Sequence, residues 1–322
     1  MITVDRLTKK YGDKTAVSDL SFQINPGKVT GFLGPNGAGK STTMRMIVGL
    51  DEPTQGRALV AGKRYAQLKH PLREVGALLD ARAGHPGRSA CHHLLGMARS
   101  NGIPASRVGE VLDTVGLGEV ARKRIGSFSL GMGQRLGIAG ALLGDPKVLL
   151  FDEPVNGLDP DGVRWVRELM RQLAAEGRTV FVSSHLMSEM QETADHVIVI
   201  GRGKVIADAP IEEVIASSSL NAVRVRTPQP DVLRRELLQL GMTVERSAGD
   251  APDELMVVGG TLEEIGDLAF RHRVPVHELS LRKASLEQAY MELTAASVEY
   301  GSPSLAHVPD THVTPATDPQ EA

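Results

Sequence analysis

The sequence predicts an α/β domain that is followed by a smaller α+β domain. From Ile2 to about Asp208, short apolar runs alternate with segments of helical period, which is typical of a parallel sheet covered by helices. Beyond the serine run 217–219 the predicted order becomes strand, helix, two strands, helix and strand, which indicates a split βαβ arrangement. We therefore expect a first domain over residues 1–216 and an accessory domain over residues 217–299.

The strand-length apolar runs of the first domain are expected to form its sheet. Val29–Leu33 leads into a glycine-rich turn, and Ser41–Leu50 has helical character up to the breakers Asp51-Glu52-Pro53. Helical spacing predominates over residues 84–135, so we expect a helical insert there. Further strands are predicted at residues 148–151, 179–182, 196–200 and 204–207.

The accessory domain is expected to contain four strands and two helices before a closing helix. The strands are predicted at Ala222–Arg226, Thr243–Arg246, Glu254–Val258 and Val274–Leu279. The helices are predicted at Asp231–Leu240 and Leu262–Arg271, and the closing helix at Leu286–Thr294. Residues 300–322 contain four prolines without periodicity, so we expect a disordered tail.

Composition excludes several classes of protein. Of the 322 residues, 41% are hydrophobic and 23% charged, which is sufficient for a substantial core. The net charge of −3 and the aromatic content of 3% argue against a nucleic-acid partner. Cys91 is the single cysteine, and neither a signal-peptide core nor a stretch of 18 apolar residues is present. We expect a cytoplasmic protein whose contact with a membrane runs through a partner.

The strongest motif is the segment Gly34-Pro35-Asn36-Gly37-Ala38-Gly39-Lys40-Ser41, which matches the phosphate-loop pattern. The glycines let successive backbone N–H groups turn toward nucleotide phosphates, and the ammonium of Lys40 adds positive charge. The Ser41 hydroxyl can reach a Mg²⁺ ion, and Thr42 extends the beginning of the following helix. The motif predicts a nucleotide-binding site.

A second motif places two acids after the apolar run Val148–Phe151. Four apolar residues in succession predict a central parallel strand that is buried on both faces. Asp152 then follows as a candidate Mg²⁺ ligand, and Glu153 as a candidate general base for an attacking water molecule. Together with the phosphate loop, these acids predict nucleotide hydrolysis.

Over about residues 1–216 the chain resembles the ATP-binding subunit of an ABC transporter. The resemblance implies a P-loop ATPase fold with ATP and Mg²⁺ as cofactors. It also implies adenine stacking on Tyr11 and contact of His185, which follows Val180-Phe181-Val182-Ser183-Ser184, with the γ-phosphate. The segment Asn156-Gly157-Leu158-Asp159 resembles the family's D-loop, which adds Asp159 to the nucleotide-binding residues.

Two family motifs depart from the usual pattern. The signature segment is Phe128-Ser129-Leu130-Gly131-Met132, with Leu130 and Met132 replacing a glycine and a glutamine, although Ser129 and Gly131 are retained for the γ-phosphate. At the position of the Q-loop glutamine stands Asp80. Its carboxylate can bind Mg²⁺ but has no N–H to donate. A metal site at Cys91-His92-His93 is disfavoured, because adjacent helical residues diverge by about 100°.

Within this family the chain is most similar to drug and antibiotic exporters of the daunorubicin and bacitracin type. The similarity lies in Ser127–Met132, Val155–Pro160 and Ser285–Thr294. It implies export through a separate membrane permease by an ATPase on the inner face of the membrane. A homodimer is expected, with Ser129 and Gly131 of one chain closing on the ATP held by Lys40 of the other. The alternatives are a heterodimer with a paralogue, a soluble ATP-driven clamp and a regulatory ABC protein.

Overall fold

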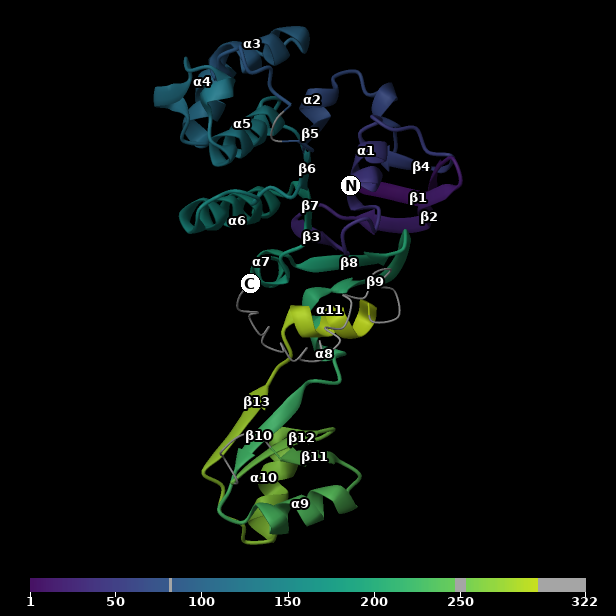
Figure 1. Ribbon diagram of the computed structural model, residues 1–322, viewed down its shortest axis with the longest axis vertical. Coiled ribbons are helices and arrows are strands. Elements are labelled where there is room, and N and C mark those ends of the chain that lie inside the picture. The colour runs from purple at the N-terminus through teal and green to yellow at the C-terminus, as the bar shows by residue number, and fades with distance from the viewer. Residues whose placement is uncertain (81–82, 247–252, 295–322) are drawn as a thin grey trace, which may run out of the picture.

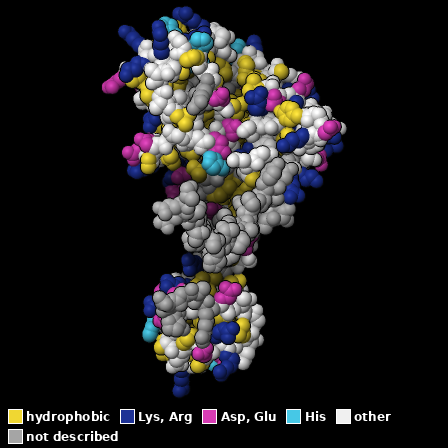
Figure 2. Space-filling view, in the orientation of Figure 1, with side chains coloured by type: hydrophobic (Ala, Val, Ile, Leu, Met, Phe, Trp, Pro, Cys, Tyr) yellow, Lys and Arg dark blue, Asp and Glu magenta, His cyan; other side chains and the backbone are white. Residues whose placement is uncertain are grey.

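The computed structural model describes residues 1–80, 83–246 and 253–294, and in this part of the chain it consists of a large body and a small lobe. Figure 1 shows the body built around one sheet that is seen edge-on, with the small lobe at its lower end. Figure 2 shows the same lobe as a separate mass beneath the body. The expected tail at residues 300–322 lies outside the described residues.

The central sheet of the body confirms the predicted α/β fold. Its strand order is β5-β6-β7-β3-β8-β9, and all neighbours are parallel except the antiparallel pair β8 and β9. The five predicted strands, β3, β6, β7, β8 and β9, begin and end within three residues of their expected ends, whereas β5 was not predicted. The bounds are β3 Lys28–Leu33, β5 Val75–Leu78, β6 Val148–Asp152, β7 Thr179–Ser184, β8 His196–Gly201 and β9 Lys204–Pro210.

A second, antiparallel sheet of order β2-β1-β4 covers one face of the central sheet and was not foreseen as a separate layer. Its strands are β1 Ile2–Tyr11, β2 Lys14–Ile24 and β4 Gln55–Val60. Tyr11 pairs with Lys14 across a two-residue turn, so the first two strands form a hairpin instead of a parallel crossover. Between the two sheets, the rings of Phe22, Phe32 and Phe181 lie 5.0 to 6.1 Å apart.

Helices complete the body. Helix α1 packs between the two sheets, whereas α5 and α6 cover the opposite face of the central sheet. The expected helical insert over residues 84–135 contains α3, α4 and the beginning of α5, which continues to Leu142. The bounds are α1 Lys40–Ile47, α2 Pro71–Glu74, α3 Ala90–Ser100, α4 Ser106–Thr114, α5 Leu130–Leu142, α6 Pro160–Ala175, α7 Met187–Thr193 and α8 Ile211–Ala216.

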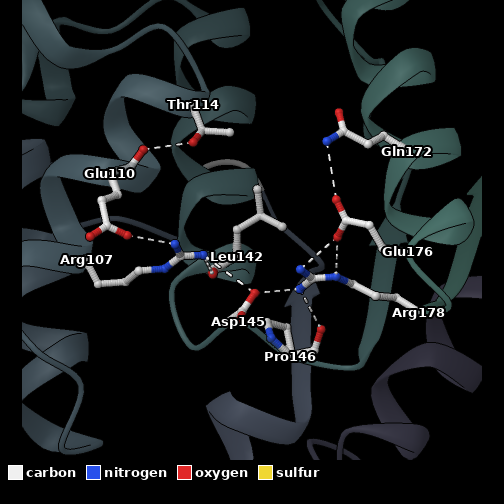
Figure 3. A network of polar contacts seen from close by, with 9 residues as sticks. All are labelled: Arg107, Glu110, Thr114, Leu142, Asp145, Pro146, Gln172, Glu176 and Arg178. Carbon is white, nitrogen blue, oxygen red and sulfur yellow. Dashed lines mark hydrogen bonds and ion pairs between the residues drawn. The ribbon is translucent and has the colours of Figure 1, made fainter.

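A chain of polar contacts joins the helical insert to the end of α6 (Figure 3). Arg107 of α4 pairs with Glu110 at 2.8 Å and donates to the carbonyl of Leu142 at 3.3 Å. Asp145, which follows α5, lies between Arg107 at 3.7 Å and Arg178 at 2.8 Å. The insert is therefore held to the sheet by charged groups as well as by the apolar core.

The small lobe confirms the predicted order of strands and helices. Its antiparallel sheet has the order β11-β12-β10-β13, with both helices on one face. The last strand begins four residues later than predicted, because Val274 caps the preceding helix through the carbonyl of Ala269 and Pro275 has no N–H for a ladder. The bounds are β10 Ala222–Arg226, α9 Pro230–Gln239, β11 Thr243–Arg246, β12 Glu254–Val258, α10 Leu262–Arg271 and β13 Glu278–Arg282.

The closing helix, α11 (Leu286–Thr294), forms as predicted but does not pack in the accessory domain. Its buried residues Leu286, Ala289 and Tyr290 belong to the core of the body, where they meet α7, α8 and β9. The core of the small lobe contains none of them. The accessory domain is thus an excursion from the body over residues 221–283, and the chain returns to the body with α11.

We expect Leu286→Ala to destabilise the body. Leu286 is fully buried, and truncating such a leucine costs about 2–5 kcal/mol. Trp165 in α6 is the single tryptophan, so its fluorescence during urea unfolding reports the body alone. Leu281→Ala in β13, where half of the side chain is exposed, should leave this transition within about 0.5 kcal/mol of the parent. An unchanged transition for Leu286→Ala would contradict the placement of α11.

Candidate functional site

The candidate site lies where three neighbouring strands of the central sheet end. Leu33 of β3 is in register with Ser184 of β7, and Asp152 of β6 is in register with Ser183. Because the strands are parallel, the residues that follow them meet at one edge of the sheet. The phosphate loop, the two acids and His185 come together there, in the arrangement that their positions in the sequence predicted.

The phosphate loop has the backbone that only glycine adopts without strain. Gly37 and Gly39 have positive φ angles of 82° and 105°, and Gly39 immediately precedes α1. A Cβ on Gly34 would lie 2.5 Å from the carbonyl oxygen of Ile200 in β8. The first turn of α1 contains no acidic side chain. The positive end of this helix is therefore available for an anion.

Lys40 is buried at the start of α1. Its ammonium donates to the carbonyl oxygens of Gly34 at 2.5 Å and Pro35 at 3.4 Å. Burial lowers the pKa of Lys40, whereas the carboxylates of Glu153 and Asp152 oppose this shift. A buried ammonium is costly unless anions compensate it, so the site is suited to a ligand with several negative charges. Ser41 is exposed and Thr42 half-buried in the same first turn.

Ser183 holds both acids in place, a role that the sequence analysis missed. Its hydroxyl donates to Asp152 Oδ1 and accepts from the Glu153 N–H at 3.1 Å. The carbonyl of Glu153 accepts from Gln134 Nε2 of α5 at 2.8 Å. Glu153 also has a φ of 51°, which costs free energy for a residue with a Cβ. The contacts of its N–H with Ser183 and of its carbonyl with Gln134 thus maintain an unfavourable backbone conformation at the candidate general base.

His185 and Glu153 form a direct pair. The distance from His185 Nδ1 to Glu153 Oε2 is 2.7 Å. A carboxylate only accepts hydrogen bonds, so Nδ1–H donates and Nε2 remains for another partner. The contact orients the Glu153 carboxylate and ties the loop after β7 to the loop after β6.

Tyr11 projects from the end of β1 near the C-terminal end of α1. Its hydroxyl donates to Asp51 Oδ2 at 3.2 Å, and Arg45 of α1 donates to the same oxygen at 2.8 Å. Partial burial and the carboxylate of Asp51 raise the pKa of Tyr11. Lys9 lies 5.0 Å from the ring centroid. Half of Tyr11 is exposed, so the ring is held in one orientation and is available for stacking.

The signature and D-loop residues form a second group, away from the phosphate loop of the same chain. Ser129 caps α5 by accepting from the Met132 N–H at 3.2 Å, and Asp159 caps α6 by accepting from the Gly162 N–H at 2.9 Å. A Cβ on Gly131 would lie 3.2 Å from the carbonyl of Gly157. Figure 1 shows α5 and α1 on opposite sides of the central sheet. Ser129, Gly131 and Asp159 therefore lie at the starts of α5 and α6, in two segments that contact each other.

Asp80 follows β5 by two residues, and β5 pairs with β6 in parallel. Its position is consequently at the same edge of the sheet as Asp152. Asp80 also lines a cavity of about 490 Å³ with Arg45, His93 and Gly137. Its assignment as a Mg²⁺ ligand stays a prediction.

Of the two histidines of α3, His92 contacts the helix cap, whereas the buried Nδ1 of His93 has no hydrogen-bond partner among the described residues. His92 Nδ1 lies 2.8 Å from the Ser89 hydroxyl, which caps the helix. Within residues 1–80, 83–246 and 253–294, no cluster of three or more His, Cys, Asp or Glu side chains is arranged to hold a metal ion. In the same ranges, no helix combines the length and the apolar character needed to span a membrane.

Comparison with known proteins gives matches to both parts of the chain. The family model described as ABC transporter matches residues 17–156, and one described as Domain of unknown function (DUF8746) matches residues 221–287. The bacitracin transport ATP-binding protein BcrA of Bacillus licheniformis is 42% identical over 217 residues, which is 66% of this chain and 71% of that protein. The uncharacterized ABC transporter ATP-binding protein YhcH of Bacillus subtilis is 33% identical over 305 residues, covering 93% and 97% of the two chains.

A solved structure supports the same fold. The dimeric structure of MJ0796, a bacterial ABC transporter cassette, aligns with a TM-score of 0.61 and 24% identity. The alignment covers 65% of this chain and 98% of that one. At this identity the likeness concerns the fold of the body.

We expect Ser183→Ala to slow ATP hydrolysis about tenfold, because loss of the hydroxyl releases both Asp152 and Glu153 from their positions. The affinity for ATP should change less, since the phosphate loop is untouched. Ser100→Ala, at the exposed end of α3, serves as the control. Steady-state kinetics and nucleotide titration give both quantities, and a parental rate for Ser183→Ala would contradict this role.

Proposed function

The chain belongs to the ATP-binding proteins of ABC transporters, and we propose that it energises export of a drug-like or antibiotic substrate through a separate membrane permease. As a member of this family it binds and hydrolyses ATP. The observation that carries the proposal is the convergence of Lys40, Asp152, Glu153 and His185 at one edge of the central sheet. The similarity to a bacitracin transport protein favours an antibiotic as the exported substrate.

The residues of the site fit a nucleoside triphosphate. The Lys40 ammonium is buried among backbone carbonyls, and the first turn of α1 has no acid to neutralise the helix dipole. Phosphate oxygens would supply the negative charge that both features need. Tyr11, fixed by Asp51, offers one ring face to the adenine.

The donor set also fits Mg²⁺, which prefers oxygen ligands. Ser41 contributes a hydroxyl and Asp152 a carboxylate, and Asp80 lies at the same edge as a further carboxylate. When bound, the ion neutralises charge on the β- and γ-phosphates. Ser183 donates to one oxygen of Asp152, which orients this carboxylate independently of any ligand.

Hydrolysis divides between three side chains. Lys40 compensates charge on the phosphates, and Glu153 accepts a proton from the attacking water molecule. His185 donates to Glu153 through Nδ1 and presents Nε2 for the γ-phosphate. Because the side chains of His185 and Glu153 are hydrogen-bonded, movement of one alters the position of the other.

Two copies of the chain would complete each site. Within one chain, the signature residues Ser129 and Gly131 lie at the beginning of α5, on the other side of the sheet from α1. A two-fold, head-to-tail homodimer would bring these residues to the ATP held by Lys40 of the partner. A similar cassette is dimeric in its solved structure. The permease would lie in the membrane, with this dimer on its cytoplasmic side.

We expect Lys40→Ala and Glu153→Gln to separate binding from turnover. Lys40→Ala removes the charge that compensates the phosphates, so tight ATP binding should be lost. Glu153→Gln keeps the shape of the side chain but cannot accept the proton, so binding should persist while hydrolysis falls by at least about a hundredfold. Nucleotide titration and phosphate release measure the two effects. Parental hydrolysis by Glu153→Gln would refute the general-base assignment.

ATP should drive dimerisation of Glu153→Gln, because contacts of Ser129 and Gly131 with the γ-phosphate exist only in the closed pair. Light scattering with and without Mg-ATP measures the mass, starting from 34.5 kDa for one chain. Adding Ser129→Arg to Glu153→Gln should block the closed pair while leaving nucleotide bound. A mass that stays at one chain in saturating Mg-ATP, also with the permease present, would contradict the composite homodimer.

A further inference from the structure

Helix α7 connects the candidate site to the rest of the molecule. It begins at Met187, two residues after His185, so a displacement of α7 must move the backbone of His185. On one side, Arg167 of α6 pairs with Glu189 at 3.0 Å and with Glu192. On the apolar side, Met187 and Met190 enter the core of the body. The remaining support of this short helix comes from α11.

The contact between α11 and α7 combines a hydrogen bond with buried apolar surface. Gln191 Oε1 accepts the backbone N–H of Leu286 at 2.7 Å, which satisfies an N–H at the beginning of α11 that has no partner inside the helix. Leu286, Ala289 and Tyr290 share the core cluster that contains Met187 and Met190. Helices α7 and α11 therefore stabilise each other's position on the body.

The beginning of the accessory domain is fastened to the same helix. Glu292 of α11 accepts from the Ser218 hydroxyl at 2.6 Å and from the Ser219 N–H at 3.2 Å. These serines lie between α8 and β10, where the sequence analysis placed the boundary between the two domains. The segment that leads out of the body is thus bonded to the helix that leads back into it.

Asn221 ties the outgoing and returning segments together. Its Nδ2 donates to the carbonyls of Ile215 at 2.6 Å and Ser218 at 2.9 Å, at the end of α8. Its Oδ1 accepts the N–H of Ala284 at 2.9 Å, two residues before α11. Ala284 is itself buried. Because Asn221 bonds the outgoing segment to the returning one, a movement of the accessory sheet is transmitted to α11.

We propose that the accessory domain controls ATP turnover by positioning His185 through the contact between α11 and α7. The path runs from the accessory sheet through Asn221 and Ala284 to α11, and through Gln191 to α7. Gln191 is a positioning residue in this scheme, since its side chain bonds to the Leu286 N–H of α11 and acts on His185 only through α7. The inference rests on the proposed role of His185 as the partner of Glu153 and the γ-phosphate. It gives the accessory domain a regulatory function at that site.

Variants of Gln191 in the full-length protein test the proposal. Gln191→Leu removes the acceptor for the Leu286 N–H, whereas Gln191→Glu retains one and serves as the matched control. Met291→Ala, on the exposed face of α11, is the surface control. Single-turnover hydrolysis should be about tenfold slower in Gln191→Leu, with ATP affinity and Tm close to parental values. Both control variants should remain within about twofold of the parent.

A double-mutant cycle separates this path from a general structural effect. In the background of His185→Ala, Gln191→Leu should lose most of its effect, because both changes act on the same side chain. An equal effect in both backgrounds would overturn the proposal. So would a parental rate for Gln191→Leu, or a parallel loss of ATP affinity. If His185→Ala itself hydrolysed ATP at the parental rate, the role of His185 in the proposed function would fail as well.

Hydrogen exchange gives a second readout that needs no turnover. The amides of residues 186–190 should exchange faster in Gln191→Leu than in Gln191→Glu when nucleotide is absent, since α7 has lost one of its supports. The amides of α6, which takes no part in the bond between Gln191 and Leu286, should exchange at the same rate in both variants. Equal exchange of α7 in the two variants would overturn the proposal.

Discussion

Ser183 lies opposite Asp152 in the parallel pairing of β6 with β7, and its hydroxyl touches two consecutive acidic residues. A slip of this pairing by one residue would turn Ser183 to the other face of the sheet and leave both acids without their partner. The register is fixed by the apolar residues of both strands, which are buried on both faces of the sheet. The positions of Asp152 and Glu153, and through Glu153 that of His185, thus depend on the packing of the sheet.

At the same edge of the sheet, groups that attract anions lie beside groups that repel them. The buried ammonium of Lys40 and the positive N-terminal end of helix α1 attract anions, while the carboxylates of Asp152 and Glu153 repel them. A triphosphate would satisfy the first group, and a divalent cation, as proposed above, would shield it from the second. Glu153 adds backbone strain, with a φ of 51° that contacts from Ser183 and Gln134 maintain. Charge and a positive φ therefore coincide at Glu153, a residue assigned to chemistry, whereas β6 and β7 beneath it are buried and largely apolar.

Sequence reasoning located what is encoded locally. The phosphate loop and the acids after β6 lie in continuous segments, so their residue types and spacing suffice. Ser183 and Gln134 were missed because their roles arise from tertiary register, and a serine in a strand carries no signal of its own. The apolar face of α11 predicted a helix, but it would be the same against any apolar surface, so its docking on the body was not predictable. Asp51, which orients Tyr11, had been interpreted only as a helix breaker.

The altered signature segment has a structural explanation in the same chain. A Cβ on Gly157 of the D-loop would lie 2.2 Å from the side chain of Leu130, so Leu130 occupies space that only glycine leaves open. The replacement of the usual signature glycine by Leu130 is thereby accommodated within one chain. Ser129 and Gly131 remain beside it to face a partner's nucleotide. Because Gln134 of the same helix bonds to Glu153, α5 connects the surface that would meet one ATP molecule with the residue that would hydrolyse the other.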